Sequence, residues 1–211
     1  MPEGPMRDLL FPPSNGGYAK GQETREAILT AALRVLVDEG YAAMTMRRVA
    51  KECGIRFGNL TYHYRSHEDL VNALFEAVIG AYEAEFALIV NDPDTAPADR
   101  LRRYCRFVLT DIQTRETTHI FPEIWALANH SPFVARLMTE MYRRARAPIL
   151  EILRDMRPDL SEQGHEDLAL FVSATMEGMT MFLGHGKLHA DRLSALMDIQ
   201  VEAFLSAIAR A

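Results

Sequence analysis

The chain has 211 residues, of which 48% are apolar and 25% are charged, and its formal net charge is −6. This length and composition allow one large core or two smaller ones, and they exclude a low-complexity protein. The two cysteines are too few for a disulfide framework, and no apolar run of about eighteen residues is present to span a membrane.

The first twenty residues predict a disordered leader. They combine several prolines and a Gly16-Gly17 pair with no helical periodicity. The leader has no apolar stretch of signal-peptide length. Together with Cys53 and Cys105, which sit in apolar helical patterns, this favours a reducing, cytoplasmic location.

Two short helices joined by a tight turn are predicted between Thr45 and Tyr64. A longer helix over residues 23–39 precedes them and ends at Gly40. Thr45 suits the N-cap of the first short helix, and Gly54 supplies the turn before the second. This order is typical of a helix-turn-helix, whose second helix enters a DNA groove.

The charge is divided unevenly along the chain. Residues 20–67 carry a balance of +3, whereas residues 68–211 carry −8. A basic head on an acidic body would orient the molecule on DNA.

The second short helix, from Arg56 to about Tyr64, carries side chains suited to DNA. Arg56 can read guanine, Asn59 can read adenine, and Phe57 can press on a thymine methyl group. Hydroxyl and imidazole groups nearby can donate to phosphates. The candidate DNA-binding residues are Thr45, Arg47, Arg48, Arg56, Phe57, Asn59, Thr61, Tyr62, His63 and His67.

Beyond this region every apolar pattern is helical. Ser66 and Asp69 predict the capping box of a long fourth helix reaching about Phe86. A loop follows at residues 91–97, and the remaining patterns predict only helices, with one shorter helix started or kinked at Pro122. The predicted fold class is therefore all-α.

The stretches ETREAILTAALRVLVDEGY, TMRRVAKECGI and GNLTYHYRSHEDL, with the long helix after them, resemble the N-terminal domain of the TetR family of bacterial transcriptional regulators. The resemblance implies a DNA-binding domain over residues 21–66 and a helical effector-binding and dimerisation domain over 67–211. It assigns phosphate contacts to Tyr62 and His63. Thr61 and His67 depart from the family, which often has an aromatic residue and a lysine at these two positions.

The resemblance further implies a repressor that a small molecule releases from its operator DNA. The fourth helix would act as the lever between effector and head. Two such chains would pair through helices at about 163–184 and 191–209. The candidate ligand-binding residues in the body are Tyr104, Phe107, His119, Phe121, Trp125, His130, Met176 and Met179.

Two other functions stay open from the sequence. The Glu-x-x-His pairs Glu116/His119 and Glu162/His165 have the spacing found in di-metal carboxylate enzymes, although both lie near predicted helix starts. A helical interaction protein without DNA binding is the third reading. We expect no enzyme activity, no metal and no cofactor, because no catalytic arrangement or phosphate-binding loop stands out.

Overall fold

The computed structural model describes residues 6, 9–11 and 19–211. These residues form only helices and turns, which confirms the all-α fold class for the described part. Most of the predicted leader, residues 1–20, lies outside the described residues. Within it, Met6 and Leu9 are buried against the core.

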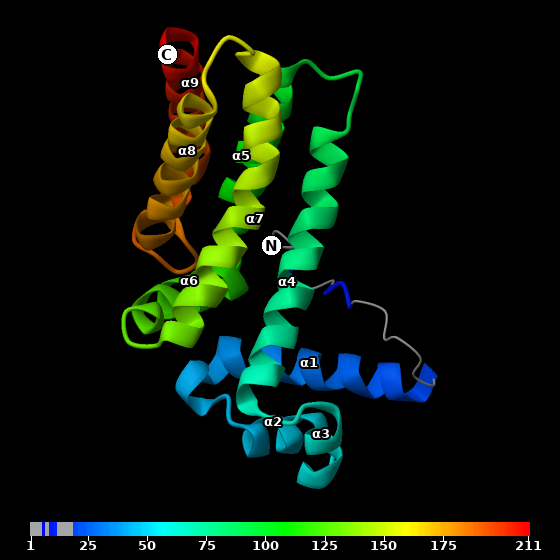
Figure 1. Cartoon of the computed structure of the whole chain (residues 1–211). Helices are drawn as coiled ribbons and strands as arrows, with labels where there is room; N and C mark the ends of the chain where they lie inside the picture. Colours follow the sequence, from blue (N-terminus) through cyan, green and yellow to red (C-terminus); the bar gives the residue numbers. More distant parts are fainter. Residues whose placement is uncertain (1–5, 7–8, 12–18) are drawn as a thin grey trace.

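The first four helices form a small head and the connection to the body. In Figure 1 the head lies at the lower end, and the long helix α4 rises from it into the body. The elements are α1 (Ala19–Glu39), the 3-10 turn η2 (Tyr41–Ala43), α2 (Met46–Cys53), α3 (Phe57–His63) and α4 (His67–Val90).

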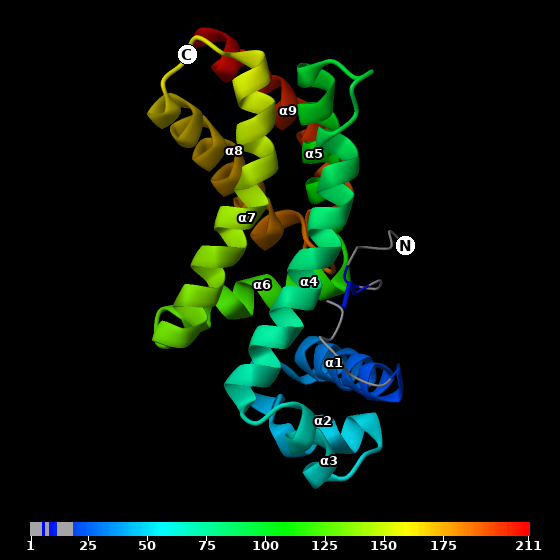
Figure 2. The same cartoon turned by 45° about the vertical axis from the view of Figure 1, so that its right-hand side comes forward.

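Five further helices form the body. Four of them stand roughly along the upper half of α4, with α8 on the side away from it, whereas α6 lies crosswise nearer the head (Figures 1 and 2). They are α5 (Pro97–Asp111), α6 (Arg115–Ala128), α7 (Pro132–Met156), α8 (Glu162–Leu183) and α9 (Leu193–Arg210), with the 3-10 turn η3 (Ala190–Arg192) before α9.

Capping and turn residues form the helix-turn-helix where the sequence predicts it. The Thr45 hydroxyl accepts the Arg48 N–H at 3.2 Å, and Gly54 ends α2 with a positive φ of 71°, a conformation that glycine adopts without strain. Ser66 and Asp69 form the reciprocal capping box at the start of α4.

Three predicted helix boundaries are wrong. α4 ends at Val90 and not at about Phe86. α1 begins at Ala19 and not near Glu23, and inside it the Thr24 hydroxyl donates to the Lys20 carbonyl. α6 begins at Arg115, capped by Thr114, so that Pro122 lies inside the helix. All three helices are longer than their apolar patterns alone indicate.

The apolar core falls into two clusters that meet along α4. The lower cluster joins the head to the first half of α4 and also contains Ile120 and Ile124 of α6. The upper cluster starts at Phe86 and fills the body as far as Ile208. Because α6 packs in the same core cluster as the head, the head contacts the body through α6 as well as through α4.

Within the described ranges, no helix combines the length and the apolar character needed to cross a membrane.

Candidate DNA-binding surface and ligand cavity

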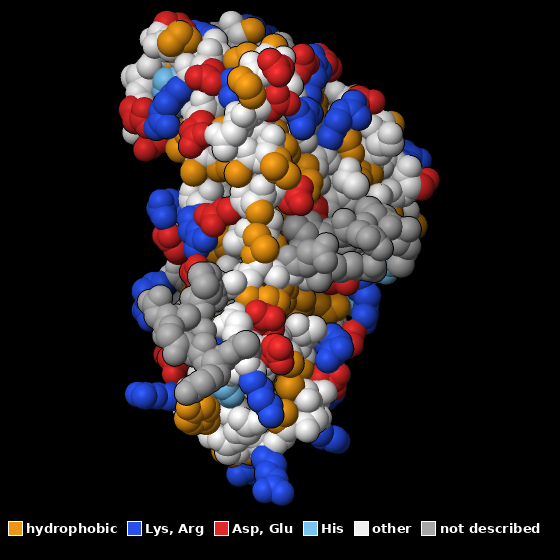
Figure 3. Space-filling model, turned by 90° about the vertical axis from the view of Figure 1, so that its right-hand side faces the viewer, with side chains coloured by type: hydrophobic (Ala, Val, Ile, Leu, Met, Phe, Trp, Pro, Cys, Tyr) orange, Lys and Arg blue, Asp and Glu red, His pale blue; other side chains and the backbone are white. Residues whose placement is uncertain are grey.

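The helix α3 presents a polar and aromatic surface at the lower end of the molecule. Leu60 is its buried anchor, whereas Arg56, Asn59 and Tyr62 are exposed, and Tyr62 keeps 82% of its surface in solvent. Lys and Arg side chains project from this end in Figure 3. The arrangement leaves three predicted contact residues open to a DNA groove.

Two arginines lie over aromatic rings at or beside α3. The guanidinium of Arg47 lies 5.6 Å from the centre of the Phe57 ring, and that of Arg25 lies 5.0 Å from the ring of Tyr64, which is buried. Phe57 is 45% exposed at the start of α3, so Arg47 covers a ring that faces solvent.

Two of the predicted DNA-binding residues have partners inside the protein. The Arg48 guanidinium is paired with both Glu39 and Glu52, so its charge is already balanced. The imidazole of His67 is hydrogen-bonded to the Met44 carbonyl at 2.8 Å and packs edge-on against Tyr41. In the free protein, these partners hold the Arg48 guanidinium and the His67 imidazole within the head.

The remaining predicted contacts lie around α3. Thr45 and Arg47 are exposed at the start of α2, and Thr61 is partly buried, with its hydroxyl donated to the Gly58 carbonyl. His63 is also partly buried, and its pKa is lowered by desolvation and by the nearby charge of Arg25. A neutral His63 can donate one hydrogen bond to a phosphate.

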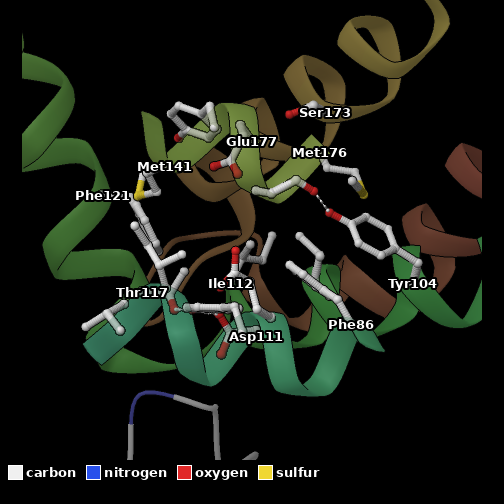
Figure 4. Close-up of a pocket in the computed structure, with 17 residues that line it drawn as sticks. Phe86, Tyr104, Asp111, Ile112, Thr117, Phe121, Met141, Ser173, Met176 and Glu177 are labelled. Carbon is white, nitrogen blue, oxygen red and sulfur yellow. Dashed lines mark hydrogen bonds between the residues drawn. The ribbon is translucent and has the colours of Figure 1, made fainter. Parts of the chain in front are cut away.

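A partly open aromatic cavity lies between α4, α5, α6, α7 and α8 of the body (Figure 4), and we call it the inner cavity. Its volume is about 60 Å³, counted as the space that the centre of a water molecule can occupy. Aromatic rings form much of its wall, namely Tyr82, Phe86, Tyr104, Phe121 and Tyr142.

Three acidic side chains line the inner cavity. Glu83 is neutralised by Arg144, whose guanidinium donates to it at 2.7 and 2.5 Å. Asp111 and Glu177 approach the cavity from opposite sides in Figure 4. No lysine, arginine or histidine is among the described lining residues.

Asp111 is held by two hydroxyl groups. One of its carboxylate oxygens accepts from Tyr82 at 2.5 Å and from Thr117 at 2.7 Å, and the other oxygen is buried with no described partner. Burial raises the pKa of Asp111, and the two hydrogen bonds partly offset that rise. Desolvation likewise raises the pKa of Glu177 to about 7, and the charge of Asp111 adds to the effect.

The predicted ligand-binding set is only partly brought together. Tyr104, Phe121 and Met176 line the inner cavity. Phe107 and Met179 instead pack against the upper core cluster. Trp125, His119 and His130 do not line the inner cavity.

Trp125 lies in a separate open groove between α6, α7 and α8, which we call the outer groove. Its indole donates to the Tyr142 hydroxyl at 2.6 Å. The outer groove shares Tyr142, Ser173 and Glu177 with the inner cavity, so these side chains form the wall between the two.

The two histidines predicted as polar ligand contacts point away from the cavity. The Nδ1 atom of His119 is hydrogen-bonded to the Val37 carbonyl of α1 at 2.9 Å, and His130 is exposed at the end of α6. His119 fails as a ligand contact because it lies on the face of α6 that packs on the head.

The sequence reading missed the acidic members of the cavity. Asp111 and Glu177 both interrupt apolar helical patterns, Asp111 beside Ile112 and Glu177 beside Met176. An acidic residue on an apolar helix face is costly to bury unless it has a partner, and that is the signal that could have found them.

The histidines of the two Glu-x-x-His pairs are bonded to backbone carbonyls, His119 to that of Val37 and His165 to that of Arg157 at 2.9 Å. The part of the chain that the structure describes contains no group of three or more His, Cys, Asp or Glu placed to hold a metal ion.

Two family models match this chain. The model of bacterial regulatory proteins of the tetR family matches residues 28–74, from α1 into α4. The model of the BetI-type transcriptional repressor C-terminal region matches residues 97–206, which is most of the body.

Curated relatives show the same likeness. The chain is 30% identical over 138 residues to an HTH-type transcriptional regulator in the dhlA 5′ region of Xanthobacter autotrophicus, and 28% identical over 135 residues to the HTH-type transcriptional regulator BetI of Rhizobium meliloti. Each match spans 64% of this chain and 66% of the relative, just under two thirds of its length.

Solved structures share the whole fold. A transcriptional regulator from Saccharomonospora viridis in complex with choline superposes with a TM-score of 0.70 at 20% identity, covering 85% of this chain and 96% of that one. A TetR-family regulator from Mesorhizobium loti gives a TM-score of 0.74 at 16% identity, covering 90% and 98%.

Proposed function

The chain belongs to the TetR family of bacterial regulatory proteins, and from that premise we propose that it is a transcriptional repressor released from operator DNA by a small molecule. The observation that carries the proposal is the joint presence of an exposed α3 on a basic head and a partly open cavity in the body. The first gives a DNA-reading surface, and the second gives a place for an effector.

In this proposal, α3 enters the major groove. Arg56, Phe57 and Asn59 face base edges, and Thr45, Arg47, Thr61, Tyr62 and His63 fix the register on phosphates. Neither Arg47 nor Arg56 is in an ion pair with a residue that the structure describes, which supports their use on DNA.

The repressor acts as a homodimer through the predicted segments 163–184 and 191–209. Large apolar side chains are exposed on α8 and α9, including Phe171, Phe182 and Ile199. An apolar face of this kind on a helix pair favours burial against a second copy. Two heads would then reach half-sites one helical turn of DNA apart.

The switch is an equilibrium between DNA-binding and released states. A ligand shifts it only through a difference in affinity for the two states. We propose that the ligand acts through α4, which runs from the cavity to the head, and through α6, which is hydrogen-bonded to the head at Glu123 and His119.

The test is selection of bound duplexes from a random library by the full chain. We expect an inverted repeat to be enriched, to be bound by a dimer, and to lose affinity steeply with added salt because of the phosphate contacts. A monomer that enriches no sequence at low salt would refute the proposal.

A further inference from the structure

We propose that the inner cavity binds a protonated amine, that is, a small organic cation that keeps at least one N–H. This rests on the function proposed above and deepens it, because it names the chemical class of the effector. The class differs from that of choline, the ligand of the Saccharomonospora viridis structure, which is a quaternary ammonium without any N–H.

The charges around the cavity favour a cation. Glu83 already has Arg144 as its partner, but Glu177 and Asp111 have no basic partner among the described lining residues. Burying carboxylates without compensation is costly, and a cationic ligand supplies the missing charge.

The hydrogen bonds around the cavity require a donor. The hydroxyl protons of Tyr82 and Thr117 are both given to the same oxygen of Asp111, and that of Tyr104 is given to the Ala145 carbonyl at 2.8 Å. Three hydroxyl groups of the wall are therefore already used as donors.

Acceptors, in contrast, remain unused. The second oxygen of Asp111 is buried without a described partner, and the Glu177 carboxylate projects into the cavity with Tyr142 as its one hydrogen-bonding neighbour. Leaving such acceptors unsatisfied costs free energy that an N–H donor recovers and a tetra-alkyl ammonium does not.

The walls and the size of the cavity favour a small alkyl cation. The rings of Phe86 and Tyr104 lie with centroids 4.7 Å apart, and Tyr82 and Phe121 form another pair at 6.5 Å. Aromatic faces attract cations. The cavity of about 60 Å³ holds about four to six water-sized groups, since each needs roughly 10–15 Å³ on this measure.

Proton release gives the proposal a second observable. Desolvation holds the pKa of Glu177 at about 7, so part of the population carries a proton at neutral pH. A bound cation favours the ionised carboxylate and lowers that pKa. Amine binding near pH 7 should therefore expel protons, which calorimetry in buffers of different ionisation enthalpy detects.

The test is calorimetry on the purified full-length protein with four probes of equal size, each of five non-hydrogen atoms so that all fit the cavity: butylamine, N,N-dimethylethylamine, tetramethylammonium and butanol. We expect the first two to bind, the quaternary ion to bind at least about tenfold more weakly, and the alcohol not to bind. Equal affinity for the quaternary ion would overturn the N–H requirement. Equal affinity for butanol, or no binding by either amine at millimolar concentration, would overturn the cation site.

Glu177→Gln should reduce amine affinity by more than about tenfold and abolish proton release. Glu166→Gln, an exposed acid on the same helix, is the matched control and should change neither. A melting curve checks that both variants fold. If Glu177→Gln bound the amines as tightly as the parent chain, the assignment would be wrong.

Failure of the amine class is distinguishable from failure of the repressor function. An amine that binds but leaves operator affinity unchanged would refute the switch and keep the amine site. Release from the operator by a neutral or anionic compound in the same cavity would refute the amine class and keep the switch.

Discussion

The carboxylate of Glu123 accepts the backbone N–H of Tyr41 at 2.7 Å. This bond joins the body helix α6 to the 3-10 turn η2, which follows α1 in the head. His119 and Arg115, one and two turns earlier on α6, contact the Val37 carbonyl and Asp38 of α1. These three residues recur every four positions and so share one face of α6.

Another face of α6 lines the inner cavity with Thr117 and Phe121. One rigid helix therefore touches both the cavity and the head. We expect a ligand that displaces Thr117 or Phe121 to shift these head contacts as well, which would make α6 a second route beside the predicted lever α4.

The first prediction concerns this joint. Glu123→Ala should keep both amine binding and sequence-specific DNA binding. The factor by which effector weakens DNA binding should fall about fivefold or more, because the two sites lose a shared contact. Anisotropy titrations of labelled operator measure both affinities. Glu140→Ala, an exposed acid on α7, is the control; an unchanged ratio in Glu123→Ala would count against coupling through this bond.

The second prediction concerns Gly40, which has a φ of +84°. A Cβ atom there would lie 3.0 Å from Oε1 of Glu123. Gly40→Ala should therefore cost about 1–2 kcal/mol in the free energy of unfolding, partly from the left-handed backbone and partly from the contact. In a Glu123→Ala background the cost should fall, since only the backbone part remains. Urea unfolding of the four proteins measures this; equal costs in both backgrounds would rule out the contact.

The third prediction compares two arginines of the head. Arg56→Ala should lose about 1–3 kcal/mol of operator binding and relax the preference for one base pair, if Arg56 reads guanine. Arg48→Ala should leave base preference intact, because Glu39 and Glu52 already engage its guanidinium. Binding to a panel of single-base operator variants separates the two. An equal loss on every sequence for Arg56→Ala would make it a phosphate contact.

The fourth prediction is the pH dependence of stability. The pKa of Glu177 is raised to about 7 in the folded state, above its ordinary value of 4.5. Its contribution to stability is therefore fully present below pH 4.5 and is lost as the pH rises through 7. Between pH 5 and pH 8, the free energy of unfolding should therefore fall by roughly 1–3 kcal/mol less in Glu177→Gln than in the parent chain. Urea unfolding at the two pH values measures this.

Other groups near Glu177 titrate outside this window or act in the same direction. Tyr142 and Tyr82 have pKa values raised by desolvation, and Asp111 has a raised pKa of its own. Arg146 of α7 lines the outer groove together with Glu177. If the unfolding free energies of Glu177→Gln and the parent chain fell in parallel from pH 5 to pH 8, Glu177 would not be the group that titrates.

Local chemistry explains why the head could be predicted closely. The Thr45 cap, the Gly54 turn and the Ser66–Asp69 box each act within a few residues, so sequence spacing determines them. The boundaries missed at Ala19 and Arg115 also involve local contacts, the Thr24–Lys20 bond and the Thr114 cap, but neither of these lies in the apolar pattern from which the helices were predicted.

The cavity could not be predicted in the same way. Tyr104, Phe121 and Met176 were found because apolar residues on body helices are good candidates in general. Asp111 and Glu177 come together from helices 66 positions apart, and the orientation of each helix decides whether an acid faces solvent or cavity. His119 shows the converse, since its polar ring satisfies a carbonyl of the head.

The last prediction tests the dimer. Phe182 on α8 is 67% exposed in the single chain, and Leu88 on α4 is 68% exposed. Phe182→Glu should yield a monomer with at least about tenfold weaker operator binding, because burying a carboxylate in an apolar interface is costly and one head contacts only one half-site. Leu88→Glu should stay dimeric and bind normally, although it adds the same charge to an equally exposed position. Light scattering gives the mass of each variant. A dimeric Phe182→Glu would place the interface away from this end of α8, and a monomeric Leu88→Glu would move it to α4.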